Sequence, residues 1–84
     1  MSKTSTMNVR LNEVEKLKKF VNVVSRTDLK VKAISTTDEE YVINAKSIFG
    51  LLSLDLSAPI MIQVKGVDEE VDKFFDSISE FACN

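Results

Sequence analysis

Hydrophobic and polar residues alternate with two different repeats in the first third of the chain. From Met7 to Leu11 every second residue is apolar, which is typical of a strand with one buried face. Residues 13–25 repeat their apolar side chains every three or four positions instead, which predicts a helix with one apolar stripe. The members of that stripe are Val14, Leu17, Val21 and Val24.

The start of this helix has the residue types of a capping box. Asn12 is a favourable N-cap, and Glu15 follows it three residues later. Glu13 and Glu15 would lie in the first turn, where negative charge interacts favourably with the helix dipole. We therefore expect Asn12 to cap a helix that begins at residue 13.

Three further strands are predicted downstream. Residues 28–35 alternate between apolar and polar side chains, and residues 40–44 are rich in strand-forming types, with a polar turn between the two stretches. Pro59 cannot donate a ladder hydrogen bond and marks the start of a strand over residues 60–64. Gly66 is expected to end that strand.

Two more helices complete the predicted order of elements. Residues 45–58 contain a short helix, and residues 67–82 form a longer one with acidic residues at its start. The apolar stripe of the longer helix consists of Val67, Val71, Phe74, Ile78 and Phe81. Every strand has one apolar face, which favours an α+β open-faced β-sandwich: a four-stranded antiparallel sheet with three helices on one face, in the order β-α-β-β-α-β-α.

Length and composition limit the classes of function. The 84 residues predict a single domain over residues 7–84, with residues 1–6 as a disordered lead-in. The net charge of −2 without a basic block argues against nucleic-acid binding, and no apolar run is long enough to insert in a membrane. Cys83 is the only cysteine, which favours a reducing, cytoplasmic location. We expect no metal, because the acidic residues near 68–72 match no calcium loop. We also expect no cofactor and no enzymatic activity, because the sequence has no Gly-rich phosphate loop, catalytic triad or zinc-ligand spacing.

The segment "VINAKSIFGLLSLD", residues 42–55, is more specific. It resembles the stretch before and through the second helix of HPr, the histidine-containing phosphocarrier of the bacterial phosphoenolpyruvate-dependent sugar phosphotransferase system. "KGVDEEVDKF", residues 65–74, is similar to the strand-to-helix junction of that family. The resemblance extends over residues 7–82 and implies an HPr-like fold and a role connected with sugar transport.

One departure from the HPr pattern bears directly on chemistry. HPr proteins carry the phosphoryl group on a histidine at the start of the first helix, whereas this chain has no histidine. Asn12 and Glu13 occupy the corresponding position. A phosphocarrier needs a neutral imidazole nitrogen as its nucleophile, which asparagine does not supply. Glu13 could form an acyl phosphate in principle, but the stabilisation of the helix start is a sufficient reason for its presence.

Ser47 is the residue that the resemblance marks for regulation. In many HPr proteins the serine of this motif is phosphorylated by a dedicated ATP-dependent kinase. A phosphate at the start of a helix meets free backbone N–H groups, and Lys46 would add a neighbouring cation. The alternative is that Ser47 only caps the short helix.

The short helix also carries more apolar side chains than one stripe can bury. Ile48, Leu51 and Leu52 have the spacing to face the sheet, so Phe49 should lie outside that stripe and be exposed with Leu52 or Ser53. The alternative is that Phe49 folds back onto residues 55–58. The residues expected to dock partner proteins are Lys46, Ile48, Phe49 and Leu52.

These observations predict a regulatory or adaptor module with protein partners, such as an HPr kinase or a transcriptional regulator. Two alternatives stay open: a residual phosphocarrier with a non-histidine acceptor, and a plain structural or oligomerising domain.

Overall fold

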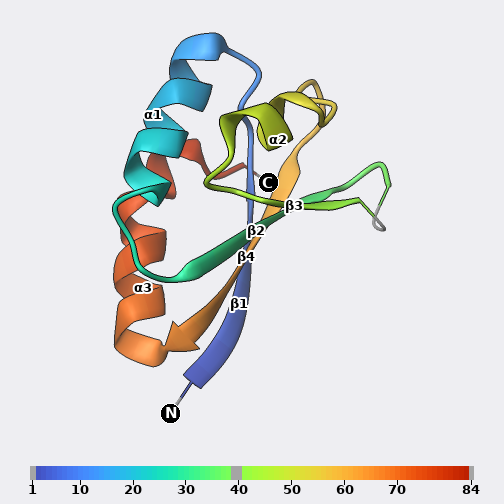
Figure 1. Ribbon diagram of the computed structural model, residues 1–84. Helices are drawn as coiled ribbons and strands as arrows, with labels where there is room; N and C mark the ends of the chain where they lie inside the picture. The colour runs from blue at the N-terminus through green and yellow to red at the C-terminus, as the bar shows by residue number, and fades with distance from the viewer. Residues whose placement is uncertain (1, 39–40, 84) are drawn as a thin grey trace.

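The computed structural model describes residues 2–38 and 41–83, which form a four-stranded antiparallel sheet and three helices (Figure 1). The strands are β1 (Ser2–Val9), β2 (Lys30–Ser35), β3 (Val42–Asn44) and β4 (Ile60–Val67), in the spatial order β1-β4-β2-β3. The helices are α1 (Val14–Val24), α2 (Ile48–Leu52) and α3 (Asp68–Ser77), followed by a 3₁₀ turn, η1 (Ser79–Phe81). The predicted order of elements and the predicted fold class are confirmed.

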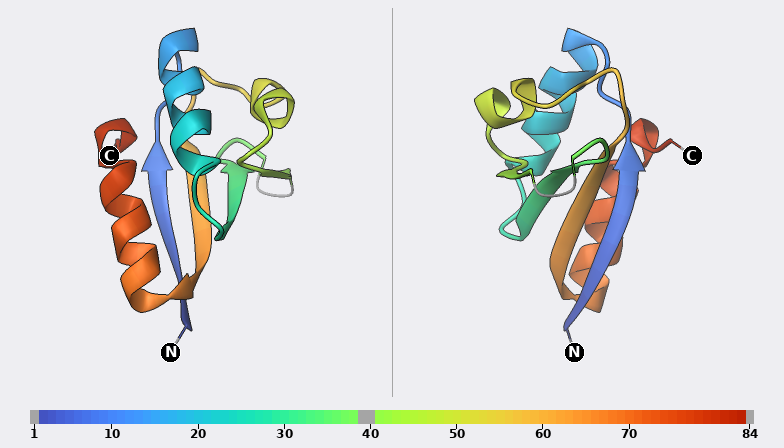
Figure 2. Two further views of the ribbon diagram at one scale, coloured as in Figure 1. Left: turned by 60° about the vertical axis from the view of Figure 1, so that its left-hand side comes forward. Right: turned by 90° about the vertical axis from the view of Figure 1, so that its right-hand side faces the viewer.

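The hydrophobic core lies between the sheet and the helices. In Figure 2, α1 and α3 cover one side of the sheet, and the right-hand view shows its other face free of helices. Alternate residues of the strands are buried, as the two-residue repeat predicts. The buried strand residues include Val9, Val31, Ala33, Ile60, Ile62 and Val64. Among the described residues, no helix has the length and the apolar run that crossing a bilayer needs.

The apolar stripe of α1 differs from the prediction at two residues. Val14 is 63% exposed, whereas Phe20, which the prediction omitted, is fully buried. Phe20 packs edge-to-face against Phe81, with 5.5 Å between the ring centroids. The face of α1 that points to the core thus consists of Leu17, Phe20 and Val24, and Val14 is the first residue of the helix.

The N-terminal strand begins earlier than predicted. Residues 2–6 were expected to be disordered, but they pair with β4 from Ser2 opposite Val67 to Thr6 opposite Gln63. Lys3 also forms an ion pair of 2.7 Å with Asp72, and this hydrogen bond raises the pKa of the lysine. The prediction is wrong for these residues because β4 is long enough to supply partners for all of them. Met1 and Asn84 lie outside the described residues.

Gly66 does not end β4, as the sequence suggested, but lies within it opposite Lys3. A Cβ atom at this position would approach the Leu29 Cδ2 atom to 2.6 Å. The glycine therefore makes room for Leu29 beneath the strand. Val67, expected in the stripe of the last helix, is 48% exposed because it belongs to the end of β4.

Strand β3, the second strand of the β2–β3 hairpin, is shorter than predicted. β3 begins at Val42, and Glu39 and Glu40, which belong to the predicted turn and strand, lie outside the described residues.

The C-terminal segment returns to the end of β1. Val9 forms an isolated antiparallel bridge with Ala82, and the Cys83 N–H donates to the Asn8 carbonyl at 2.9 Å. The Arg10 N–H donates in turn to the Phe81 carbonyl at 3.0 Å. These bonds hold η1 against the point where the chain leaves β1 for α1.

Candidate functional site on helix α2

Helix α2 starts from a turn that is held by Asn44. The Lys46 N–H donates to Asn44 Oδ1 at 2.9 Å, and the Ser47 N–H donates to the Asn44 carbonyl at 3.0 Å. Ser47 then has an extended backbone, with φ −97° and ψ 111°, and its Oγ accepts a hydrogen bond from the Gly50 N–H at 3.1 Å. Ser47 is thus the N-cap of α2, and its side chain is exposed.

Lys46 is half-buried and is held by a bond to another loop. Its Nζ donates to the Thr27 carbonyl at 2.6 Å, which joins the start of α2 to the connection between α1 and β2. The ammonium group therefore has a structural partner. The sequence had suggested instead a free cation beside Ser47.

The apolar side chains of α2 divide between the core and the surface. Leu51 is fully buried and Ile48 is half-buried against the core. Leu52, which was also expected to face the sheet, is 52% exposed, so that part of the prediction is wrong. Phe49 is 82% exposed, which excludes the alternative that it folds back onto residues 55–58. A five-residue helix has only one narrow side toward the core, and Leu51 fills it.

Tyr41 extends the exposed apolar surface beyond α2. Its hydroxyl shares a hydrogen bond of 2.6 Å with Ser53 Oγ, and its side chain is 40% exposed. Phe49 and Leu52 are three residues apart on the helix surface, where side chains are neighbours. We refer to Tyr41, Phe49 and Leu52 as the α2 patch. The sequence analysis missed Tyr41, because only the tertiary contact with Ser53 places it beside α2.

Gly50 allows α2 to lie close to β3. A Cβ atom at this position would be 3.0 Å from the Ile43 Cδ1 atom and 3.3 Å from Ser47 Oγ. The glycine thus serves the close packing of the helix on its own sheet.

The start of α1, where the resemblance places the missing histidine, is built differently. The N-cap is Glu13, with φ −126° and ψ 142°, and no side-chain cap bond is formed. The predicted Asn12 cap is therefore wrong, because the helix begins one residue later than expected. Within the described residues, the side chains of Asn12 and Glu13 make no hydrogen bond or ion pair, and both are exposed. The nearby Arg10 donates from Nη1 to the Ser57 carbonyl at 3.3 Å.

The loop after α2 is ordered by Asp55. Its Oδ1 accepts hydrogen bonds from the Ser57 hydroxyl at 2.5 Å and from the Ser57 N–H at 3.1 Å. Both bonds favour the ionised carboxylate and lower the pKa of Asp55. The loop that accepts the Arg10 bond is thereby stabilised next to the start of α1.

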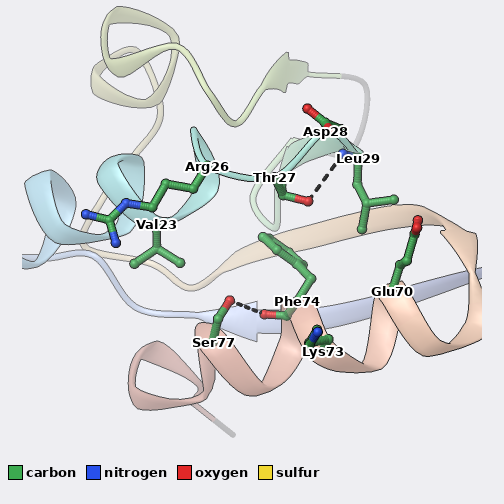
Figure 3. A pocket seen from close by; sticks show the side chains of 9 residues that line it. All are labelled: Val23, Arg26, Thr27, Asp28, Leu29, Glu70, Lys73, Phe74 and Ser77. Atoms are coloured by element: carbon green, nitrogen blue, oxygen red, sulfur yellow. Dashed lines mark hydrogen bonds between the residues drawn. The ribbon is translucent and has the colours of Figure 1, made fainter.

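A cavity of about 470 Å³ lies between the end of α1 and α3, with Phe74 in its lining (Figure 3). Its charged residues balance: Arg26 and Lys73 are basic, and Asp28 and Glu70 are acidic. In the close-up, Arg26 extends away from Asp28. No buried side-chain polar atom in the described part of the chain lacks a hydrogen-bond partner.

Three acidic residues, Asp68, Glu69 and Glu70, lie in the first turn of α3. Over residues 2–38 and 41–83, no group of three or more histidine, cysteine, aspartate or glutamate side chains could hold a metal ion. The acidic residues instead occupy the first turn of the helix, where the dipole favours them.

No family model matches the chain, and no curated protein matches it. Solved structures do. HPr-C-His from Thermoanaerobacter tengcongensis is 22% identical, with a TM-score of 0.64 over 93% of this chain and 92% of that one. The fold is that of HPr. The phosphocarrier protein HPr from Bacillus anthracis str. Ames is 19% identical, with a TM-score of 0.67 over 98% of each chain. The HPr-like architecture that residues 42–55 and 65–74 suggested is thus confirmed at the level of the fold.

Proposed function

We propose that this HPr-fold protein is a regulatory or adaptor module that docks partner proteins through the α2 patch and does not relay phosphoryl groups. The observation that carries the proposal is the 82% exposure of Phe49 next to the Ser47 cap, in a chain without histidine. The partners that the resemblance suggests are an HPr kinase or a transcriptional regulator.

The start of α1 supports the absence of a relay. A labile phosphoramidate requires an imidazole, and neither Asn12 nor Glu13 provides one. An acyl phosphate on Glu13 would need nearby cations to offset its charge, and Arg10 is already bonded to the Ser57 carbonyl. Arg10 is therefore not available to stabilise an acyl phosphate on Glu13, which argues against the residual-phosphocarrier alternative.

The α2 patch has the chemistry of a transient interface. Phe49 presents a whole aromatic ring to solvent, and aromatic residues supply a large share of the binding energy at protein interfaces. Leu52 and Tyr41 enlarge the apolar surface, and the polar Ser47 and Ser53 lie at its border. A patch of this kind serves reversible docking better than permanent association.

Phosphorylation of Ser47 would switch this surface. The modification adds about −1.5 to −2 charges at neutral pH, two residues from Phe49. The phosphate oxygens would replace Oγ as acceptors for the first N–H groups of α2, so the helix would remain capped while the charge of the patch changed. Docking of an apolar partner surface would then be weakened, and docking of an arginine-bearing one strengthened.

Docking is tested by comparing two exposed apolar side chains. Purified partner candidates, first an HPr kinase, are titrated against the wild type, Phe49→Ala and Val14→Ala, and binding is measured by calorimetry. We expect Phe49→Ala to weaken binding at least tenfold, because it removes the central aromatic anchor. Val14, 63% exposed at the start of α1, provides the matched control and should leave the affinity unchanged. Equal affinities for all three proteins would contradict docking through α2.

The switch and the relay are tested separately. Incubation with an HPr kinase and ATP should add one phosphoryl group to the wild type and none to Ser47→Ala, as measured by intact mass and peptide mapping. An unmodified wild type, beside a control HPr that is modified, would refute the switch. Radiolabelled phosphoenolpyruvate with the first enzyme of the phosphotransferase system should leave this protein unlabelled. A label on Glu13 would favour the residual phosphocarrier instead.

A further inference from the structure

The helix-free face of the sheet has an uneven distribution of charge. None of the residues in the four described strands is acidic, although the chain contains 13 acidic residues. The side chains that alternate with the buried Val31 and Val64 point to this face. They include three lysines: Lys30 and Lys32 on β2, and Lys65 on β4.

The strand register brings these lysines together. Lys30 is the direct partner of Lys65, and Lys32 follows Lys30 by two residues on the same face. Directly opposed side chains have Cβ atoms about 5 Å apart, and residues two apart along a strand are separated by roughly 7 Å. Like charges in directly opposed positions destabilise a sheet. The three lysine side chains therefore leave the sheet from neighbouring positions on one face.

Among the described residues, no ion pair or hydrogen bond offsets this repulsion. All three lysines are exposed, and across the part of the chain that the structure describes they form no ion pair or hydrogen bond. The other neighbours in the register are neutral: Thr4 lies opposite Lys65, and Gln63 lies opposite Lys32. The sheet thus maintains a cation cluster that its own folding does not use.

A cavity of about 360 Å³ adjoins the cluster at the β2–β3 end of the sheet. Its charged residues are Lys30, Lys32, Lys46 and Asp28, and its other walls include the Asn44 amide and the apolar Val42. The ammonium of Lys46 is held by Thr27, and Asp28 is the one carboxylate among the described lining residues. The volume lies within the range of small-molecule sites.

We propose that Lys30, Lys32 and Lys65 bind the phosphoryl group of a small phosphate ester, whose organic part occupies this cavity. Three ammonium donors suit a dianionic group with three equivalent oxygens. Asn44 and Asp28 would bond to hydroxyl or amino groups of the ester, and Val42 would contact its carbon atoms. This site is independent of the α2 patch and of the proposed docking function.

Nucleic acid fits this face less well. The described strands contain no aromatic residue on which a base could stack, and the net charge of the chain is −2. A small ligand needs neither stacking nor a long basic track. The cavity and the three-lysine cluster together therefore favour a monoester over a polymer.

The test is a titration followed by amide chemical shifts on the ¹⁵N-labelled full chain, at constant ionic strength. The probes are inorganic phosphate, glycerol 3-phosphate and uncharged glycerol. We expect saturable shifts at residues 30, 32 and 65 with both phosphates, additional shifts at residues 42–44 with the ester, and no shifts with glycerol. Binding of the ester should be at least threefold tighter than that of phosphate.

Variants at exposed positions separate the cluster from general charge effects. Lys65→Gln should weaken ester binding at least fivefold while it raises the melting temperature, because the repulsion with Lys30 is removed. Lys18→Gln, which removes an exposed cation of α1 on the other side of the sheet, should leave binding unchanged. Non-saturating shifts, or equal weakening by both variants, would overturn the proposal. A phosphoserine peptide that binds more tightly than the ester would overturn the assignment to a small molecule.

Discussion

The starts of α1 and α2 are two helix N-termini with opposite construction. At α2 the exposed Ser47 caps the helix with its hydroxyl, and Lys46 fixes the preceding turn through Thr27. At α1 no side chain caps the helix, and the exposed Asn12 and Glu13 have no partners within the described residues. The start of α2 is therefore fixed by side-chain hydrogen bonds beside exposed apolar residues, whereas the start of α1 has no such bonds and no imidazole.

The difference shows how a fold and its activity separate. The sheet and the helices of an HPr are present, yet Asn12 and Glu13 stand where the resemblance places the histidine. A scaffold can be retained for the surface that it presents. The start of α2 and the free face of the sheet are the surfaces on which our two proposals rest.

The largest expected effect is the difference in stability loss between a buried and an exposed residue of α2. Leu51→Ala should lower the free energy of unfolding by about 2–5 kcal/mol, because Leu51 is fully buried and its truncation leaves a cavity. Phe49→Ala should change it by less than about 0.5 kcal/mol, as is usual for an exposed position. Urea denaturation measures both. A large loss in Phe49→Ala would mean that the ring is a packing residue and no docking group.

The next comparison concerns Lys46 and Arg10, whose long side chains bond the starts of α2 and α1 to neighbouring loops. Lys46→Met removes a half-buried ammonium–carbonyl bond of 2.6 Å and should cost about 1–2 kcal/mol. Arg10→Met removes an exposed bond of 3.3 Å and should cost under about 0.5 kcal/mol. The same denaturation series supplies the comparison. Equal costs would show that the two termini are anchored alike.

The caps themselves should differ by a smaller amount. Ser47→Ala removes the acceptor for the Gly50 N–H and should cost about 1 kcal/mol. Asn12→Ala should be nearly neutral, within about 0.5 kcal/mol, since Asn12 makes no cap bond. Thermal unfolding of the two variants beside the wild type tests this difference. A costly Asn12→Ala would restore the cap that the sequence suggested.

The smallest expected effect is a change in the pKa of Asp55, in the loop after α2 that contacts Arg10 near the start of α1. In Ser57→Ala the hydroxyl bond to Asp55 is lost, so the pKa of Asp55 should rise toward its ordinary value of 3.8 but stay below it, because the backbone bond remains. In the wild type the pKa of Asp55 is lower in the folded state than in the unfolded state. The ionised carboxylate therefore stabilises the fold at pH values above the unfolded-state pKa. This contribution is lost as the pH falls through the folded-state pKa. Carboxyl ¹³C shifts followed against pH would detect the change, and an unaltered midpoint would contradict it.

Short-range patterns predicted most of the fold. The two-residue repeats identified the strands, and the three- and four-residue repeats identified the long helices, because burial on one side imposes those periods. The errors arose where a distant partner decides the outcome. Phe20 is buried because Phe81 packs against it, and residues 2–6 form a strand because β4 extends through Gly66. Neither partner is close in sequence.

The candidate site was predictable to a lesser extent. The crowding of apolar residues on a short helix indicated an exposed Phe49, and the position of Ser47 before that helix indicated a cap. The bond from Tyr41 to Ser53 and the bond from Lys46 to Thr27 join separate segments, so no local pattern could reveal them. The cation cluster on the free face depends in the same way on the register between β2 and β4.

The place of β4 in the sheet also affects how the chain is made. β4 lies between β1 and β2, so Val9 has no partner until Ile60 has been synthesised, and Ser2 waits for Val67. At roughly 5–20 residues per second, this leaves an alternating apolar strand unpaired at the ribosome for a time on the order of seconds. The beginning of β1 is rich in polar Ser and Thr, and the sheet can be completed only after β4 has been synthesised.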